Sequence, residues 1–263
     1  MISTSLKKNY FDLRGMNALV TGAGGHLGSA ISMGLAEHGA NVYLNGRNEE
    51  KLIKLKKKIN KLNCKAEIAL FDIENIKEVD NFFNKINKLD ILINNAYHGK
   101  TGKFENFSEN NYKESFNINI LSLANIVNRS LPLLKKSKKA SIINISSMYG
   151  SIIPDPKLYQ KTGLNNPPHY GVIKAALEHY TKYASVNLAK YNIRVNSISP
   201  GPFPKKSIII KYPKFIERLK SKNPLNRIGK PEDIITSILF LASPNSSFVT
   251  GSNIPIDGGW KLW

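Results

Sequence analysis

Short apolar segments with the character of strands alternate along almost the whole chain with amphipathic helical patterns. The predicted strands cover residues 17–21, 41–45, 66–71, 89–93, 141–145, 193–198 and 253–256. The predicted helices cover residues 27–37, 48–60, 76–86, 112–134, 170–190 and 231–241. Strands that alternate with helices form a mostly parallel sheet covered on both faces, and right-handed crossovers favour a doubly wound arrangement. The alternation therefore predicts an α/β fold in which a single domain spans residues 1–263.

The amino-acid composition indicates the size of the core and the cellular compartment of this fold. With 41% apolar residues, the chain can bury a sizeable core. No stretch reaches the roughly 18 consecutive apolar residues that a membrane-spanning helix needs, and residues 1–14 are unlike a signal peptide. A lone cysteine, Cys64, excludes an internal disulfide and fits a reducing compartment. We therefore expect a cytoplasmic protein without a membrane partner.

The chain is strongly basic, with a net charge of +19. Its densest lysine runs, residues 54–61 and 135–139, lie on or just after amphipathic helical patterns, where charge usually forms a solvated face. Basic and aromatic residues are not clustered as nucleic-acid binding would require, so no nucleic-acid partner is predicted. A basic surface does attract phosphorylated cofactors and anionic substrates.

The first predicted strand runs into a glycine-rich turn, Thr21-Gly-Ala-Gly-Gly-His-Leu-Gly28. Glycine lets the backbone turn sharply and approach a pyrophosphate, which the free N–H groups of the next helix then face. The position of the turn, between the first strand and the first helix, predicts a dinucleotide site in a Rossmann-like fold. The second strand ends in Asn45-Gly46-Arg47 without an acid for a ribose hydroxyl, so Arg47 favours NADP over NAD by pairing with a 2′-phosphate.

Two other features after strands are open to more than one interpretation. Asp72 either accepts a hydrogen bond from the adenine amino group or caps the helix that begins near Glu74, and the two roles are compatible. The proline-rich segment 151–168 interrupts the rhythm of the fold and is predicted to be a substrate-side loop; a surface insertion without function is the alternative. Residues 202–263 are expected to form a substrate and oligomer region.

Tyr170 and Lys174 are four positions apart on a predicted helix and therefore share a face. A free tyrosine with a pKa near 10 is protonated at neutral pH, and a cation within about 4–6 Å lowers that pKa. Such a tyrosine can exchange a proton with an alcohol or carbonyl oxygen, which a nearby serine hydroxyl could hold. The pair therefore predicts acid–base chemistry at an oxygen atom.

Over essentially its full length the chain resembles the short-chain dehydrogenase/reductase family. The matching pieces, in family order, are residues 21–28, 94–96, 119, 145–147, 170–174, 194–201, 224–233 and 257–259. The resemblance implies that Tyr170 is the acid/base, that Lys174 is its electrostatic partner and a ribose ligand, and that Ser147 binds the substrate oxygen. It also implies that Asn119 anchors a water linking Lys174 to solvent, and that the protein is a homotetramer or homodimer built on long helices.

The predicted site combines residues inferred from the sequence pattern with residues implied by the family resemblance. No metal site is predicted. The catalytic residues are Ser147, Tyr170, Lys174 and Asn119; the cofactor residues are Gly22, Gly25, His26, Leu27, Gly28, Arg47, Asp72, Ile73, Asn95, Ala96, Tyr170, Lys174, Pro200, Gly201 and Phe203.

The chain departs from the family pattern at four places. His26 replaces a glycine of the phosphate turn, and the spacing of Gly22, Gly25 and Gly28 is that of the extended branch of the family. Tyr97 replaces the glycine of the Asn-Asn-Ala-Gly motif, and we expect it to narrow the nicotinamide or substrate pocket. Residues 151–168 lengthen the spacing between serine and tyrosine, and the threonine usual after Pro-Gly is missing, leaving backbone near Phe203 for the carboxamide.

The leading prediction is an NAD(P)-dependent oxidoreductase that transfers hydride to or from a secondary alcohol or ketone. The Asn-Asn-Ala-Tyr variant and the long loop resemble bacterial oxidoreductases of flagellin-glycan and surface-sugar synthesis and gluconate 5-dehydrogenase-like enzymes, which implies a sugar or sugar-nucleotide substrate. Two alternatives stay open: an epimerase or dehydratase that retains NAD(P), and a non-catalytic cofactor-binding protein.

Overall fold

Seven strands form one parallel sheet in the order β3-β2-β1-β4-β5-β6-β7, in a computed structural model that describes residues 9–100, 104–106, 108–160, 162 and 164–262. The strands are β1 Asn17–Val20, β2 Asn41–Gly46, β3 Ala66–Leu70, β4 Ile91–Asn94, β5 Ser141–Ile145, β6 Arg194–Pro200 and β7 Asn253–Ile256. Every neighbouring pair is parallel, so the predicted doubly wound α/β sheet is confirmed.

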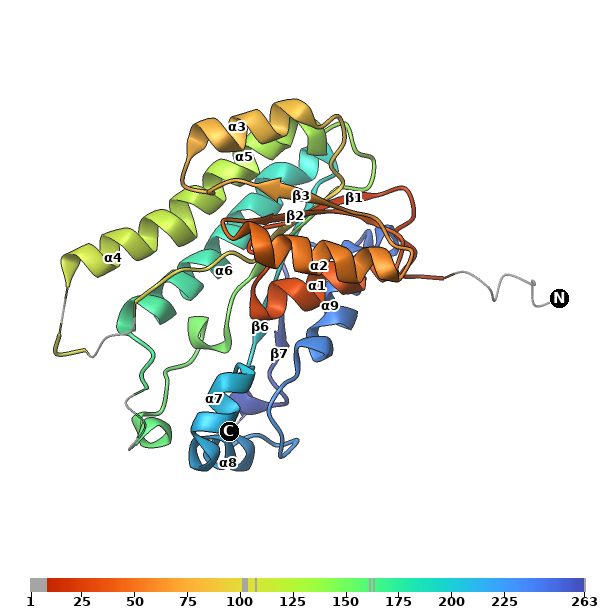
Figure 1. Cartoon of the computed structure of the whole chain (residues 1–263). Coiled ribbons are helices and arrows are strands. Elements are labelled where there is room, and N and C mark those ends of the chain that lie inside the picture. Colours follow the sequence, from red (N-terminus) through yellow and green to blue (C-terminus); the bar gives the residue numbers. More distant parts are fainter. Residues whose placement is uncertain (1–8, 101–103, 107, 161, 163, 263) are drawn as a thin grey trace.

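Helices cover both faces of this sheet (Figure 1). Their bounds are α1 His26–Glu37, α2 Glu49–Lys61, α3 Ile76–Lys85, α4 Glu109–Phe116, α5 Ser122–Leu134, α6 Pro168–Leu188, α7 Lys206–Lys211, α8 Pro213–Ser221 and α9 Ile235–Ala242. One apolar core joins the sheet to α1, α2 and α9, and a second joins it to α3, α5 and α6. Because helices cover both faces of the sheet, the central strands Ile91–Asn94 and Ser141–Ile145 are buried along their whole length, and most of their residues are apolar.

The order of the strands reverses between β1 and β4, which pair directly although β2 and β3 lie between them in sequence. In open α/β sheets, ligands bind at the carboxyl ends of the strands beside such a reversal. The fold therefore brings the residues after β1, β4, β5 and β6 to one edge.

The predicted helix over 112–134 is wrong in its start and in its continuity. Helix α4 begins at Glu109, because the Ser108 side chain caps it by accepting from the Asn111 N–H. A π-helical segment, Asn117–Leu121, separates α4 from α5. Pro132 lies inside α5 and does not end it, since a proline in the last turn removes a single N–H donor.

Other boundaries shift by a few residues, and two helices escaped prediction. Asn48 caps α2 as predicted, accepting from the Lys51 N–H, whereas α3 is capped by Asn75 and not by Asp72. The expected loop at 151–168 contains a 3-10 turn, Pro156–Tyr159, and ends where α6 begins at Pro168. Its residues 161 and 163 lie outside the described part of the chain. The unpredicted α7 and α8 carry a third apolar cluster.

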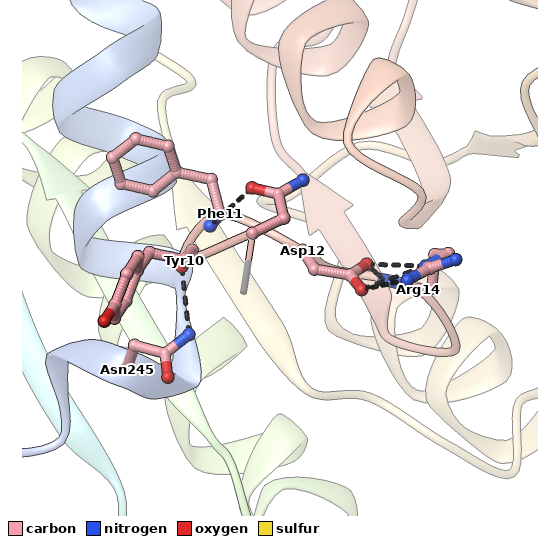
Figure 2. A network of polar contacts seen from close by, with 6 residues as sticks. Tyr10, Phe11, Asp12, Arg14 and Asn245 are labelled. Carbon is pink, nitrogen blue, oxygen red and sulfur yellow. Dashed lines mark hydrogen bonds and ion pairs between the residues drawn. The ribbon is translucent and has the colours of Figure 1, made fainter. Parts of the chain in front are cut away.

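The segment from Asn9 to Met16 is anchored to the turn that follows α9 (Figure 2). The Tyr10 carbonyl accepts hydrogen bonds from the Ser243 hydroxyl and, at 3.0 Å, from the Asn245 amide nitrogen. A nearby ion pair joins Asp12 and Arg14 at 2.6 Å. The start of the described chain is thus fixed to the end of α9. Among the described residues, no helix has the length and apolarity to cross a membrane.

Candidate active site

A cleft of about 550 Å³ opens at the carboxyl edge of the sheet, beside β1, β4, β5 and β6. It is lined by these predicted residues: Gly22, Gly25, His26, Leu27, Gly28, Arg47, Asn95, Ala96, Ser147, Tyr170, Lys174, Pro200, Gly201 and Phe203. Asp72 and Ile73 line an adjoining cavity of about 130 Å³, which shares Arg47 with the cleft. The fold therefore brings the predicted cofactor residues to one place.

The glycine-rich turn is held rigidly at the floor of the cleft. Gly22 has a φ of +65°, and a Cβ on Gly28 would lie 2.2 Å from the Gly22 carbonyl oxygen, so no other residue fits there. The Asn95 amide donates to the carbonyls of Thr21 and Gly22 at 2.9 and 3.1 Å. The first N–H groups of α1, which no side chain caps, lie at this turn.

His26, which stands in place of a family glycine, connects the turn to the segment after β6. Its ring lies near enough to the Phe203 backbone for this backbone to act on the His26 pKa, and its Nε2 is buried without a partner among the described residues. Burial lowers the pKa of His26, and the positive charge of Lys205 acts in the same direction. A neutral His26 therefore joins two walls of the cleft.

The outer end of the cleft is basic. Arg47 lies there with its guanidinium 3.5 Å from the Asp72 carboxylate, an exposed and weak ion pair. Lys51, from the first turn of α2, and Lys205, just before α7, also line the cleft, although the sequence analysis missed both. The available signal for Lys51 was its helical spacing from Asn48, and the signal for Lys205 was its nearness to Pro200 in sequence.

Tyr170, Lys174 and Ser147 meet at the inner end of the cleft. Tyr170 and Lys174 lie one turn apart near the start of α6, and Ser147 follows β5. The Ser147 hydroxyl lies near enough to the Tyr170 side chain to lower its pKa by hydrogen bonding, and it accepts from the Tyr149 N–H at 3.2 Å. The Lys174 ammonium is 5.8 Å from the Tyr170 ring centre and donates to the Ile145 carbonyl at 2.7 Å.

The pKa of Tyr170 differs in direction from what the sequence analysis expected. Burial raises the pKa of Tyr170, and the hydrogen bond from Ser147 opposes that rise without cancelling it. Lys174 was expected to bring this pKa below its ordinary value, and that net lowering does not occur here, because burial of the phenol dominates. Burial lowers the pKa of Lys174 to about 8, against the opposing charge of Glu178.

Glu178 is a residue of the site that the sequence analysis did not single out. It lies one turn after Lys174 on α6, and its Oε1 accepts from the hydroxyls of Ser146 and Ser199, both at 2.9 Å. These serines end β5 and β6, so a single carboxylate ties both strand ends to the helix of the acid–base pair. A Cβ on Gly150, three residues after Ser147, would lie 2.6 Å from this oxygen, which explains why a glycine stands at this position.

Tyr97 packs against both members of the acid–base pair. Its ring meets the Tyr170 ring edge to face with centres 5.2 Å apart, and the Lys174 ammonium lies 5.2 Å from its centre. Tyr97 lines the cleft and the adjoining cavity, as expected of a ring that narrows the pocket.

Asn119 lies in the π-helical segment and lines neither cavity. Its side chain donates to the carbonyls of His98 and Ser115 and accepts from the His98 N–H, so it holds the strand-end loop after β4. Its role in anchoring a water stays a prediction. His169, beside the tyrosine, packs on Tyr112 and is buried with a lowered pKa, in keeping with a spectator. No three His, Cys, Asp or Glu side chains in the described ranges are grouped as metal ligands.

Comparison with known proteins decides the family. The family described as enoyl-(acyl carrier protein) reductase matches residues 22–261. A 3-oxoacyl-[acyl-carrier-protein] reductase of Thermotoga maritima is 34% identical over 94% of this chain and 98% of its own length. The chain belongs to the short-chain dehydrogenase/reductase family. It is therefore an oxidoreductase of the type that acts on alcohol and ketone groups.

Other relatives of this short-chain dehydrogenase/reductase differ in what they act on. A 7α-hydroxysteroid dehydrogenase of Paraclostridium sordellii is 36% identical over 93% of this chain and 91% of its own length. The structure of a gluconate 5-dehydrogenase from Burkholderia cenocepacia in complex with NADP and tartrate superimposes with a TM-score of 0.86, at 26% identity, covering 97% of this chain and 98% of that one. The family is thus shown, whereas the substrate is not.

Proposed function

We propose that this enzyme is an NADP-dependent oxidoreductase that interconverts a secondary alcohol and a ketone on a sugar or sugar-nucleotide-like molecule. The observation that carries the proposal is the convergence of Ser147, Tyr170 and Lys174 at the inner end of a cleft with a glycine floor and a basic outer end. We assign one cofactor-binding domain to residues 1–263, with residues 151–168 bordering the substrate.

The residues of the cleft fit a dinucleotide. The turn at Gly22 and Gly28 is a cradle that a Cβ would fill, and uncapped N–H groups at the start of α1 suit a pyrophosphate. Arg47 and Lys51 supply cations where a 2′-phosphate would lie, and β2 ends without the acid that favours NAD. The Burkholderia relative is a complex with NADP, which supports the same preference; NAD is the alternative.

The bound nicotinamide supplies or accepts the hydride. Ser147 holds the substrate oxygen through its hydroxyl, and Tyr170 exchanges a proton with that oxygen. In reduction Tyr170 is the acid, and its raised pKa keeps the phenol protonated at neutral pH for this task. In oxidation it is the base, and the positive charge of Lys174 then favours the phenolate. Asn119 is assigned, by family resemblance, to hold the water that renews the proton.

The substrate assignment is supported by hydroxyl and amide groups beside Tyr170. The Tyr149 ring packs on Tyr170, and the Tyr149 and Tyr159 hydroxyls and the Asn166 amide are hydrogen-bonded in a chain; such polar groups suit a polyhydroxylated molecule. Gluconate is the substrate in the name of the Burkholderia relative. An epimerase or dehydratase with a retained cofactor, and a non-catalytic cofactor-binding protein, are the competing functions.

Cofactor binding followed by turnover tests the proposal. NADPH and NADH are titrated by fluorescence, and the enzyme is then assayed with sugars, sugar nucleotides, 3-oxoacyl thioesters and hydroxysteroids. Preferred binding of NADPH and turnover of a sugar or sugar nucleotide are expected. Tightly retained nucleotide without net oxidation of added NADPH points to the epimerase or dehydratase, and binding without any turnover points to the non-catalytic protein.

We also propose that the enzyme is a homo-oligomer, a tetramer or a dimer, and that it resides in the cytoplasm. Tyr183 and Val186 on α6 are 66% and 77% exposed, and Val172 on the same helix is exposed as well. Large apolar side chains gathered on one helix are typical of a surface that a partner covers. Analytical ultracentrifugation of the wild type and of Val186→Glu tests this: the wild type sediments as an oligomer, and the variant as a smaller species.

A further inference from the structure

The segment between β5 and α6 is fastened to α8 at several points. The Arg218 guanidinium donates to the carbonyls of Leu158 and Gln160 at 2.8 and 3.0 Å. Lys222 pairs with Asp155 at 3.0 Å. The Tyr159 ring packs on Phe215 with centres 5.4 Å apart. Figure 1 shows this green segment beside α8. The residues that lengthen the spacing between Ser147 and Tyr170 therefore form a docked wall with a defined position.

This wall carries a chain of three hydrogen-bonding side chains. The hydroxyls of Tyr149 and Tyr159 are 2.9 Å apart, and the Asn166 amide nitrogen donates to the Tyr159 hydroxyl at 2.6 Å. Burial raises the pKa of both phenols, so both keep their protons at neutral pH. Tyr149 follows β5, whereas Tyr159 and Asn166 come from the lengthened segment.

Counting donors shows that, within the described ranges of the chain, one O–H of this pair has no acceptor. Each phenol has one proton to donate, and Asn166 already donates to Tyr159. If Tyr159 donates to Tyr149, the Tyr149 proton has no acceptor among the described residues; if Tyr149 donates, the Tyr159 proton has none. A donor oriented by its partner but without an acceptor is what a site for a substrate oxygen requires.

The pair lies beside the reacting group. The Tyr149 ring meets the Tyr170 ring edge to face with centres 6.4 Å apart, and Tyr159 is close enough to Tyr170 to act on it electrostatically. We propose that the Tyr149–Tyr159 pair binds a second oxygen of the substrate, next to the carbon that is oxidised or reduced, and so selects α-hydroxy ketones and vicinal diols. This inference rests on the proposed function and narrows its substrate class.

Two matched ketones test the proposal. Reduction of 2-hydroxycyclohexanone and of cyclohexanone by NADPH is measured for the wild type and for Tyr149→Phe, Tyr159→Phe and the double variant. The ratio of kcat/KM for the hydroxylated over the plain ketone is compared between enzymes, so the intrinsic reactivity of each ketone cancels. A lost hydrogen bond of about 1 kcal/mol corresponds to a factor of about five, so we expect the ratio to fall at least fivefold in the double variant.

Tyr212→Phe is the matched control, because Tyr212 belongs to the same apolar cluster but is not part of the hydroxyl pair. Its ratio should equal that of the wild type, and thermal unfolding checks that every variant is folded. A ratio that falls less than fivefold in the double variant overturns the inference and leaves the proposed function standing. If the wild type turns over neither these ketones nor the substrate panel, the proposed function fails first.

Discussion

Lys174 is a charged residue that is deeply buried, with only 6% of its surface exposed. Its pKa falls to about 8 from an ordinary value of 10.5. Between these values the unfolded chain binds a proton that the folded chain does not, so this group makes folding more stable as pH rises from about 8 to 10.5. The same titration removes the cation from the site, and we expect kcat/KM for alcohol oxidation to lose its Lys174 contribution above pH 8.

Glu178 gives this titration a test that separates charge from structure. Glu178→Gln keeps an oxygen that can accept from Ser146 and Ser199 but removes the negative charge that raises the Lys174 pKa. The variant should lose its Lys174 cation at lower pH, with kcat/KM near pH 8 reduced roughly threefold. The pH profile of kcat/KM is the measurement. A profile with an unmoved alkaline limb shows that Glu178 only holds the strands.

Residue-scale prediction succeeded where chemistry and spacing coincide. The pattern Tyr170 to Lys174, together with Ser147, located groups that the fold brings together. Glu178 and Lys205 could not be found this way, since their importance depends on which strand ends they reach. The direction of the Tyr170 pKa shift was not predicted either, because the burial that raises this pKa depends on tertiary packing.

At the scale of elements, the turn between β1 and α1 leaves no room for a side chain at Gly28. Gly28→Ala places a Cβ against the Gly22 carbonyl and the Asn95 amide, so the turn must open. Overpacking of this kind costs about 1–3 kcal/mol of stability, and NADPH should bind at least about tenfold more weakly. Chemical denaturation and fluorescence titration measure both effects. An unchanged free energy of unfolding together with an unchanged affinity for NADPH would show that the turn has room for a side chain.

The turn between β2 and α2 decides the preference between cofactors. Arg47→Asp replaces a cation by the acid that suits a ribose hydroxyl and repels a 2′-phosphate. We expect the ratio of NADPH to NADH affinity to drop at least about tenfold, as measured by fluorescence titration. An unchanged ratio would mean that Arg47, which is exposed and weakly paired with Asp72, takes no part in recognition.

The elements that sequence reasoning misplaced are those governed by tertiary packing. Apolar periodicity found the strands and the central helices, but the periodic signal runs through Asn117–Leu121 without revealing the π-helical turn. Helices α7 and α8 are short and lie within a proline- and lysine-rich stretch, and the apolar face of α8 is buried in a cluster with Leu158 and Trp260, which are distant in sequence.

At the scale of the whole molecule, the parallel sheet puts distant chemistry at one edge. Ser147, Tyr170 and the glycine turn are far apart in the chain, yet β1, β5 and β6 all end at the cleft. Because the alternation of strands and helices fixes this geometry, the sequence was enough to predict the fold class and the location of the site. The position of the described residues between β5 and α6 depends on contacts with α8, such as the hydrogen bond from Arg218 to the Leu158 carbonyl, which no local pattern encodes.

The central claim is that the Tyr170 hydroxyl exchanges the proton at the substrate oxygen. Tyr170→Phe removes that hydroxyl and keeps the ring that packs on Tyr97 and Tyr149. Single-turnover reduction of a confirmed substrate by NADPH, measured together with NADPH affinity, is the most direct test. We predict that the rate falls by about 10²–10⁴-fold while the affinity for NADPH changes less than about threefold. A variant that keeps most of its turnover rate would contradict the assignment of Tyr170.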